Sequence, residues 1–190
     1  MVPGAWATET IPSEASGLDP ATSSAWLRVQ AELAFHPERF APALRSGQSP
    51  EALLRDAGIA RSWDDARLRR LVARHEQIGV RLVPLPDPAY PELLRTVADA
   101  PLVLSVRGRP ECLAGPAIAI VGSRAATLAA RRFACSLARD LAREGVTIVS
   151  GLARGIDAEA HRGALEAGGV TIGVLACGVD RIYPPEHRKI

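Results

Sequence analysis

A short loop at Gly122, Ser123 and Arg124 has the residue types to bind a phosphate group. It follows an apolar run at residues 117–121 and precedes an amphipathic stretch, so we expect it to join the end of a strand to the start of a helix. Glycine lets the backbone approach a ligand, serine offers a hydroxyl and an N–H, and a guanidinium can bind two phosphate oxygens. The spacing matches neither the dinucleotide fingerprint G-x-G-x-x-G nor a Walker P-loop, so no NAD, ATP or other cofactor is expected.

A second loop of the same kind strengthens this prediction. Another apolar run ends at Ser150 and Gly151, and Arg154 and Gly155 follow in the turn before the next helix. Consecutive strands of a parallel sheet are usually neighbours, and their carboxyl ends meet at one edge, so Arg124 and Arg154 should lie close together. Backbone N–H groups, two helix N-termini and two guanidinium groups along one edge suit a polyanion.

Other candidate residues near these loops have simpler explanations. Asp157 is an acid in the first turn of the second helix, and His161 lies four residues on, on the same face. Such a pair could serve acid–base chemistry, but no nucleophile or metal-ligand spacing accompanies it, so capping and packing are favoured. Gly178 and Tyr183 follow a third apolar run and could shape a groove; Tyr183 could stack a base, although packing is the simpler role. Cys177 is expected to be a small filler rather than a reactive thiol.

The elements that must position these loops alternate between strand and helix. Strands are expected at residues 117–121, 146–150 and 170–176, and helices from about 127 to 143 and from about 156 to 167. This order is typical of a parallel sheet with right-handed crossovers, so the predicted fold class is α/β.

The first of these helices is predicted to be amphipathic. Phe133, Leu137 and Leu141 recur every four residues and are predicted to face the core. The arginines of this helix are predicted to stay mostly outside; they are Arg131, Arg132, Arg139 and Arg143.

The part of the chain before residue 80 follows different patterns. Residues 1–22 are rich in Pro, Gly, Ser, Thr and Ala without periodicity, and we expect a disordered tail. Residues 23–79 are expected to form a small all-helical domain, with helix caps at Ser24, Ser49 and Ser62. Residues 80–190 are expected to form the sheet domain.

The composition sets outer bounds on function. The chain has 190 residues, is 47% hydrophobic and carries a net charge of +2, so it is not coated in positive charge. Lys189 is the only lysine, and every other basic residue apart from histidine is arginine. The three cysteines lack metal spacing and are expected to be reduced, mostly buried thiols; they are Cys112, Cys135 and Cys177. No run is long enough to span a membrane and no signal peptide is recognisable, so a cytoplasmic location is expected.

The ordered motifs from Tyr90 onward closely resemble those of the DNA-processing protein A family, also called DprA or Smf. The motifs are Tyr90-Pro91-Glu92-Leu93-Leu94, Asp99-Ala100-Pro101, Arg107-Gly108, Gly122-Ser123-Arg124, Ser150 to Asp157 with Ala160-His161, and Gly178 to Pro184. The resemblance implies a Rossmann-like sheet domain. The helical region before residue 80 is compatible with the family's N-terminal sterile-alpha-motif-like (SAM-like) domain.

The resemblance also implies a function in DNA recombination. Proteins of this family are cytoplasmic, are not enzymes, and bind single-stranded DNA with little sequence preference. They shield incoming strands during natural transformation of competent bacteria and help load the recombinase RecA. Arg124 and Arg154 would be the principal contacts with the DNA backbone. The whole predicted DNA- and phosphate-binding set is Gly122, Ser123, Arg124, Ser150, Gly151, Arg154, Gly155 and Gly178, with no catalytic residue and no metal ligand.

One departure from the family's pattern concerns length. The family's Rossmann-like domain continues with further strands and a pairing surface beyond the point that corresponds to Ile190, so we expect this chain to carry only the first part of it. Apolar faces and unpaired strand edges should then be exposed, and the chain should be marginally stable or prone to aggregate. Homodimerisation of the family's kind should be weak or absent.

Two other classes of function remain open alternatives. The first is an enzyme similar to the nucleoside-monophosphate phosphoribohydrolases that resemble lysine decarboxylases, which also place a Gly-Ser turn after their first strand. Those enzymes carry a Pro-Gly-Gly-x-Gly-Thr stretch, which this sequence lacks. The second alternative is a pure interaction module in which residues 23–79 do the work.

Overall fold

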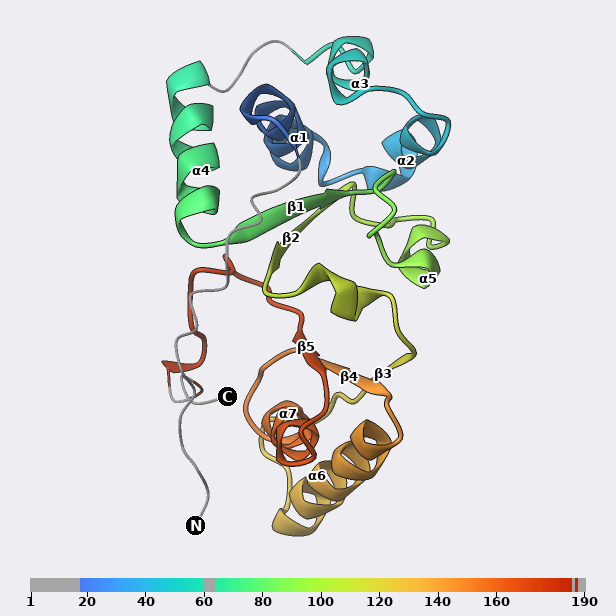
Figure 1. The fold of residues 1–190 in the computed structure, drawn as a ribbon, viewed down its shortest axis with the longest axis vertical. Helices are drawn as coiled ribbons and strands as arrows, with labels where there is room; N and C mark the ends of the chain where they lie inside the picture. Colours follow the sequence, from blue (N-terminus) through green and yellow to red (C-terminus); the bar gives the residue numbers. More distant parts are fainter. Residues whose placement is uncertain (1–17, 60–63, 186, 188–190) are drawn as a thin grey trace. The chain divides into compact units, whose positions relative to one another are not determined.

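The computed structural model describes residues 18–59, 64–185 and 187 of the chain. Most of the expected tail, at residues 1–17, lies outside the described residues, as does Ser62. The helix that Ser62 was expected to cap is capped instead by Asp64, whose carboxylate accepts the Ala66 N–H at 2.9 Å. The chain divides into two compact units, Met1–Pro110 and Glu111–Ile190, and each is described by itself (Figure 1). Among the described helices, none is long and apolar enough to cross a membrane.

The first unit begins with four helices in its described part. They are α1 (Pro20–Leu33), α2 (Pro37–Arg45), α3 (Pro50–Asp56) and α4 (Asp65–Gln77). The predicted cap at Ser49 is confirmed, because its hydroxyl accepts the Ala52 N–H at 3.2 Å.

The start of α1 differs from the prediction. Ser24 was expected to cap this helix, and the tail was expected to reach residue 22. The cap is instead Asp19, whose carboxylate accepts the N–H groups of Ala21 and Thr22, and Pro20 takes the first helical position. An aspartate followed by proline is a strong start signal, and here it acts one turn before the serine. Ser24 lies inside the helix, where its hydroxyl donates to the Pro20 carbonyl.

Two strands complete the first unit, with the short helix α5 (Glu92–Arg95) between them. The strands β1 (Val80–Pro84) and β2 (Val103–Arg107) pair with each other antiparallel and form a sheet of their own. Their buried side chains join the core of the helices, in a cluster that includes Trp26, Val29, Leu44, Leu82 and Val83. The compact units therefore divide after Pro110, whereas the sequence pattern changes near residue 80.

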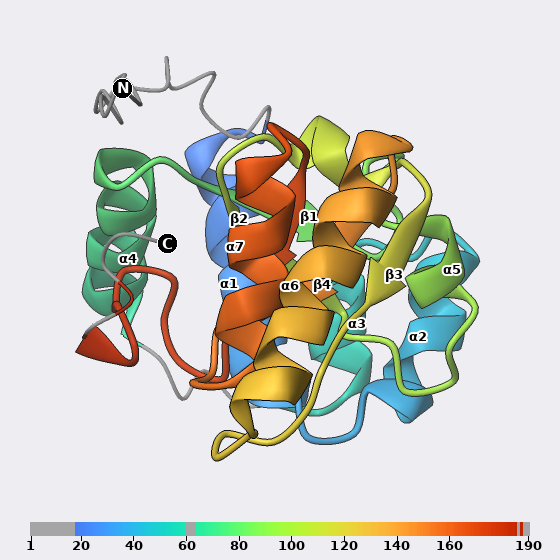
Figure 2. The same cartoon turned by 90° about the horizontal axis from the view of Figure 1, so that it is seen from below.

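The second unit alternates strand and helix as predicted. After the 3-10 turn η1 (Pro110–Leu113) its elements are β3 (Ala117–Ala119), α6 (Leu128–Arg143), β4 (Thr147–Ser150), α7 (Ile156–Glu166) and β5 (Thr171–Gly173). The three strands are parallel in the order β3-β4-β5, which confirms the predicted α/β class. Figures 1 and 2 show α6 and α7 side by side on one face of this sheet, as right-handed crossovers require.

The buried face of α6 is not the predicted one. Phe133 and Leu137 were expected in the core, but their exposed fractions are 69% and 38%, and Leu141 is only half-buried. The buried residues are small ones, Ala134, Ala138 and Ala142. They let α7 approach so closely that a Cβ on its Gly163 would collide with the Cys135 carbonyl oxygen. Small side chains therefore determine which face of α6 packs against α7. The prediction was wrong because it considered only the hydrophobicity of the side chains and not their size.

The strand β3 lies at the edge of the described sheet and is poorly covered. All three of its residues are exposed, and the apolar side chains of Val121 and Val174, just after β3 and β5, have exposed fractions of 69% and 61%. The expected exposure of apolar surface is therefore present in the described residues.

Candidate phosphate-binding edge

A buried carboxylate joins the two candidate loops. Asp157, in the first turn of α7, accepts the backbone N–H of Gly122 at 3.3 Å through one oxygen. Its other oxygen accepts the N–H groups of Gly151 at 3.1 Å and Ala153 at 3.4 Å. The predicted capping role of Asp157 therefore extends across both loops. Sequence reasoning missed the bond to Gly122, because that residue is 35 positions away.

The glycines of the site allow the two loops to come close together around Asp157. A Cβ on Gly122 would lie 2.8 Å from the Ile156 side chain, and a Cβ on Gly151 would lie 2.8 Å from the Asp157 carboxylate. Since the N–H groups of Gly122 and Gly151 already donate to Asp157, these two glycines contribute close backbone approach to the edge. Gly155 has a φ of 79°, and a Cβ there would collide with the Ser123 carbonyl oxygen.

Two further bonds fix the loops against each other. Ser150 is buried, and its hydroxyl donates to the Ile120 carbonyl at 2.7 Å, which links the ends of β4 and β3. The Ile156 N–H donates to the Ser123 carbonyl at 3.3 Å. The loops that carry Arg124 and Arg154 are therefore side by side, as the strand order predicts.

The side chains left at the surface of this edge are polar or cationic. Ser123, Arg124 and Arg154 are all exposed. The Ser123 hydroxyl accepts the N–H of Ala125 at 3.1 Å, which leaves its own proton free to be donated. Arg124 makes no hydrogen bond or ion pair with another described residue. A cation without an internal partner beside two ordered loops can bind an anion without first breaking an ion pair.

The buried His161 holds the end of a strand through its contacts. Its Nδ1 lies 2.7 Å from the Thr171 hydroxyl, which itself donates to the Ile148 carbonyl at 2.8 Å. The hydroxyl has a single proton, so it accepts from the Nδ1–H of His161. Burial lowers the pKa of His161; Asp157 opposes this shift and His187 adds to it. These contacts agree with the predicted packing role.

The segment after β5 approaches the second loop through a residue that sequence reasoning missed. His187 Nδ1 lies 2.8 Å from the Leu152 carbonyl. Gly178 and Tyr183 are exposed, and the Gly178 carbonyl accepts the Arg181 N–H at 2.9 Å. Cys177 is exposed rather than buried, which corrects its expected role as a filler.

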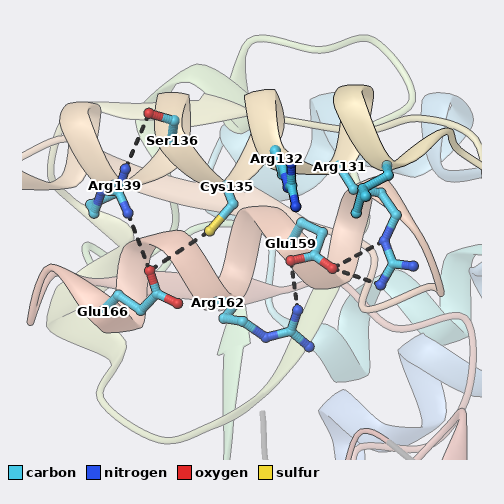
Figure 3. A pocket seen from close by; sticks show the side chains of 9 residues that line it. Arg131, Arg132, Cys135, Ser136, Arg139, Glu159, Arg162 and Glu166 are labelled. Atoms are coloured by element: carbon cyan, nitrogen blue, oxygen red, sulfur yellow. Dashed lines mark hydrogen bonds and ion pairs between the residues drawn. The ribbon is translucent and has the colours of Figure 1, made fainter.

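A second charged feature lies between α6 and α7, and sequence reasoning did not single it out (Figure 3). Glu159 is buried, and its carboxylate accepts from Arg131 and Arg162. Burial raises the pKa of Glu159, but the bonds from the two guanidinium groups outweigh this and the pKa is lowered overall.

The same groove contains the thiol of Cys135, 3.8 Å from a Glu166 carboxylate oxygen. Burial and the nearby carboxylates raise the pKa of this thiol, so it stays protonated. All three cysteines are free, but only Cys112 and Cys135 are partly buried. Among the described residues, no three His, Cys, Asp or Glu side chains are grouped to hold a metal ion.

The helical N-terminal region and the parallel sheet with arginine-bearing loops place the chain in the α/β class of proteins. Comparison with known proteins identifies the family. The sequence model of the DNA recombination-mediator protein A family matches residues 81–190. The chain belongs to this family.

Relatives and a solved structure extend this finding. The chain is 37% identical over 125 residues to the DNA processing protein DprA of Bacillus subtilis, an alignment that covers 65% of this chain. It is 38% identical over 169 residues to a putative DprA of Mycobacterium tuberculosis, covering 81% of this chain. The X-ray structure of DprA from Streptococcus pneumoniae superposes with a TM-score of 0.60 and 28% identity, over 91% of this chain and 58% of that one. The chain spans 42% of the length of each of the first two relatives.

Proposed function

We propose that this chain binds single-stranded DNA in the cytoplasm through the edge formed by its two loops. The observation that carries the proposal is the exposed Arg124, which has no partner among the described residues and lies beside the loop of Arg154. Guanidinium groups bind phosphate oxygens through paired N–H donors, and Ser123 adds a hydroxyl donor next to Arg124. The proposed site also includes Gly178, on the segment after β5, where Tyr183 is exposed as well.

The chemistry of this edge favours the DNA backbone over the bases. Phosphate contacts carry no sequence information, so binding should be sequence-tolerant and strongly dependent on salt. A protein of this kind covers a strand without reacting with it, and no catalysis is proposed. In the cell it would shield incoming strands during natural transformation and assist RecA loading.

The test is a titration of a fluorescein-labelled oligonucleotide of fifteen thymidines, followed by fluorescence anisotropy at two salt concentrations. The parent is expected to bind, more weakly at high salt. Arg124→Ala/Arg154→Ala should weaken binding by about two to four orders of magnitude, because each charge-assisted bond contributes roughly 1.5–3 kcal/mol. Neighbouring contacts are not strictly additive, so the loss in the double variant is to be compared with the losses in the two single variants.

The matched control is Arg55→Ala/Arg143→Ala, which removes the same charge from two exposed helix positions. It should bind within about threefold of the parent, since only long-range charge is lost. A folded parent that does not bind, or a loop variant that binds like the parent, would rule out the proposal. Release of free base from a nucleoside monophosphate would point instead to the phosphoribohydrolase alternative.

A further inference from the structure

The exposed sides of α6 and α7 form a groove with a volume of about 580 Å³. Arginine and glutamate side chains dominate its lining: Arg131, Arg132 and Arg139 from α6, and Glu159, Arg162 and Glu166 from α7. Four guanidinium groups face two carboxylates, so the groove carries two positive charges in excess. None of these residues belongs to the two loops.

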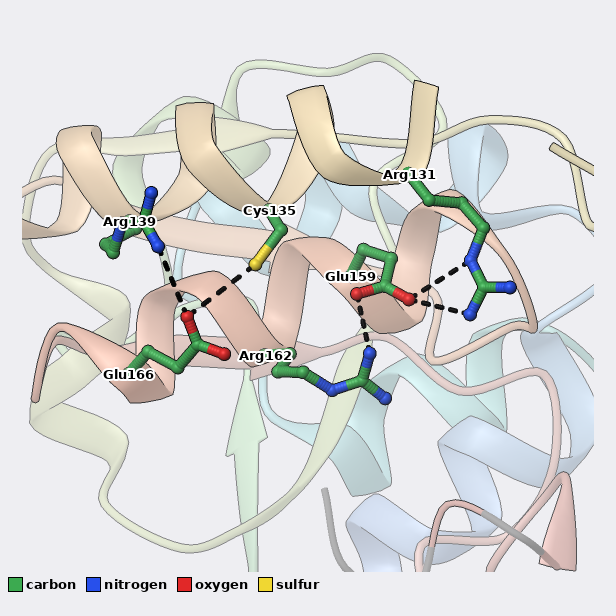
Figure 4. Close-up of polar contacts among 6 residues, drawn as sticks. All are labelled: Arg131, Cys135, Arg139, Glu159, Arg162 and Glu166. Atoms are coloured by element: carbon green, nitrogen blue, oxygen red, sulfur yellow. Dashed lines mark hydrogen bonds and ion pairs between the residues drawn. The ribbon is translucent and has the colours of Figure 1, made fainter. Parts of the chain in front are cut away.

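Glu159 orders the cations at one end of the groove (Figure 4). One of its oxygens accepts Nε of Arg131 at 3.1 Å and Nη2 at 2.7 Å. The other accepts Nη1 of Arg162 at 2.6 Å. A guanidinium has five N–H donors, so each arginine keeps unused donors while its position is fixed. Ordering the side chains in advance lowers the entropy cost of binding an anion.

Arg132 adds a third cation at the same place. Figure 3 shows it between the two helices, reaching from α6 toward Glu159. Arg132 has no hydrogen bond or ion pair with another residue in the described part of the chain. Glu159 pairs with two guanidinium groups, and Arg132 lines the same groove without a carboxylate partner among the described residues, so the unbalanced charge favours an incoming anion.

The groove begins beside the candidate loops. Arg131 is in the first turn of α6, which follows the loop of Arg124. Glu159 is in the first turn of α7, which follows the loop of Arg154. From there the groove runs along both helices toward Arg139 and Glu166, so a strand leaving the loops meets it directly.

We propose that this groove is a second phosphate-binding surface, which takes backbone phosphates of the same DNA strand beyond the two loops. The inference rests on the proposed function and extends it from one edge of the sheet to the outer side of the helices. Nucleic acid fits better than an acidic peptide because the groove begins in the first turns of the helices that follow the loops and presents guanidinium forks, whose geometry matches phosphate.

Two oligonucleotide lengths separate the groove from the loops. An oligonucleotide of five thymidines is expected to reach the loops alone, and one of fifteen to reach the groove as well, within the range of site sizes known for single-strand binders. Arg132→Ala/Arg139→Ala should weaken binding of the longer one about tenfold and reduce its salt slope by about 1.4, at roughly 0.7 per phosphate contact. Binding of the shorter one should change less than about twofold.

Two further variants keep the test decisive. Arg132→Lys/Arg139→Lys retains the charge and should recover part of the lost affinity, which also guards against misfolding of the alanine variant. Arg55→Ala/Arg143→Ala removes equal charge outside the groove and should leave the salt slope unchanged.

The outcomes distinguish this inference from the proposed function. If the loop variant loses both oligonucleotides while the groove variant binds the longer one like the parent, the groove inference fails alone and the arginines serve only to join the helices. If the parent binds neither length, both proposals fail. A glutamate-rich peptide that the parent binds and the groove variant does not, with DNA binding unchanged, would assign the groove to an acidic protein segment.

Discussion

At the scale of single residues, Asp157 occupies the position that a bound anion takes at many helix N-termini. Its carboxylate satisfies N–H groups from both loops, and its negative charge lies in the first turn of α7. The amide groups at the centre of the edge are therefore satisfied from within. Selectivity for an external anion then depends on the exposed side chains of Ser123, Arg124 and Arg154.

Gly155 offers a sharp test of the close contact between the loops. Gly155→Ala and Gly145→Ala both place alanine at a φ of 79°, which at Gly145 should cost about 1 to 2 kcal/mol of unfolding free energy. At Gly155 the ψ of −124° lies outside the left-handed helical region, so the backbone strain there is larger. At Gly145 a Cβ meets nothing within 4 Å, whereas at Gly155 it collides with the Ser123 carbonyl oxygen. Gly155→Ala should cost about 1 to 3 kcal/mol more, measured by urea unfolding. Equal losses in the two variants would contradict the contact.

The pH dependence of stability should reveal His161. Burial lowers the folded-state pKa of His161 below its ordinary value of 6.5, so the unfolded chain takes up a proton first as the pH falls. The free energy of unfolding should therefore be highest above pH 6.5 and decrease below it, by at most about 1.4 kcal/mol per pH unit. Urea unfolding at pH 7.5 and 5.5 measures this decrease.

The controls for this prediction are two histidine substitutions. His161→Gln should remove most of the difference between the two pH values. His36→Gln should preserve it, because His36 is exposed. A difference that survives in the His161 variant would mean that another group is responsible.

At the scale of elements, α6 and α7 meet along a seam of alanine and glycine. Ala138, Ala142, Ala160 and Ala164 are buried in one cluster with Ile148 of β4. Small side chains allow the helix backbones to approach, which gains dispersion contacts that larger residues would block. The bulky side chains of Phe133 and Leu137 lie off this seam.

Paired substitutions on α6 should show which face carries stability. Ala138→Leu should lower the free energy of unfolding by about 1 to 3 kcal/mol, because the seam has no room for a larger side chain. Phe133→Gln should change it by no more than about 0.5 kcal/mol, since this side chain is largely exposed. Chemical unfolding followed by circular dichroism measures both. A larger loss for Phe133→Gln than for Ala138→Leu would show that the face of Phe133 is the buried one.

The order of strands and helices could be predicted from the sequence, and so could the position of the two loops side by side at one edge of the sheet. Alternating apolar runs and helix caps such as Ser49 are local signals, and strand order follows from connection rules. The Asp157 bond to Gly122 could not be predicted, because no local pattern reports a contact 35 residues away. The packing of α6 through Ala138 could not either, since it depends on the distance to another helix. The role of Glu159 could not be predicted either, because its partners Arg131 and Arg162 lie on two different helices.

At the scale of the whole molecule, the two units differ in the size of the side chains that they bury. The first unit buries large side chains, including Trp26, Leu44, Leu85 and Tyr90. Among the described residues, the buried cluster of the second unit contains one large side chain, Ile148, among alanines, with Ile120 and Leu141 partly buried against it. Since burial of apolar area is the main source of stability, the second unit should be the weaker one in this chain.

Hydrogen exchange at increasing urea concentration should therefore show two steps. Peptides from residues 111–185 are expected to lose protection at lower urea than peptides from residues 20–107, because the second unit buries fewer large apolar side chains. Mass spectrometry of the exchanged peptides gives both midpoints in one experiment. A single shared midpoint would show that the units unfold together, and a sharply melting, non-aggregating monomer would contradict the expected marginal stability.

The smooth seam between α6 and α7 has a consequence for alignment. Large side chains interlock and fix how far one helix is shifted along its neighbour, but methyl groups and glycine hydrogens offer little such resistance. Two ion pairs across the seam resist sliding of one helix along the other. They join Arg131 to Glu159 and Arg139 to Glu166. These ion pairs therefore add to the close backbone contact at Gly163 in fixing the axial offset of the two helices, and high salt should weaken their contribution.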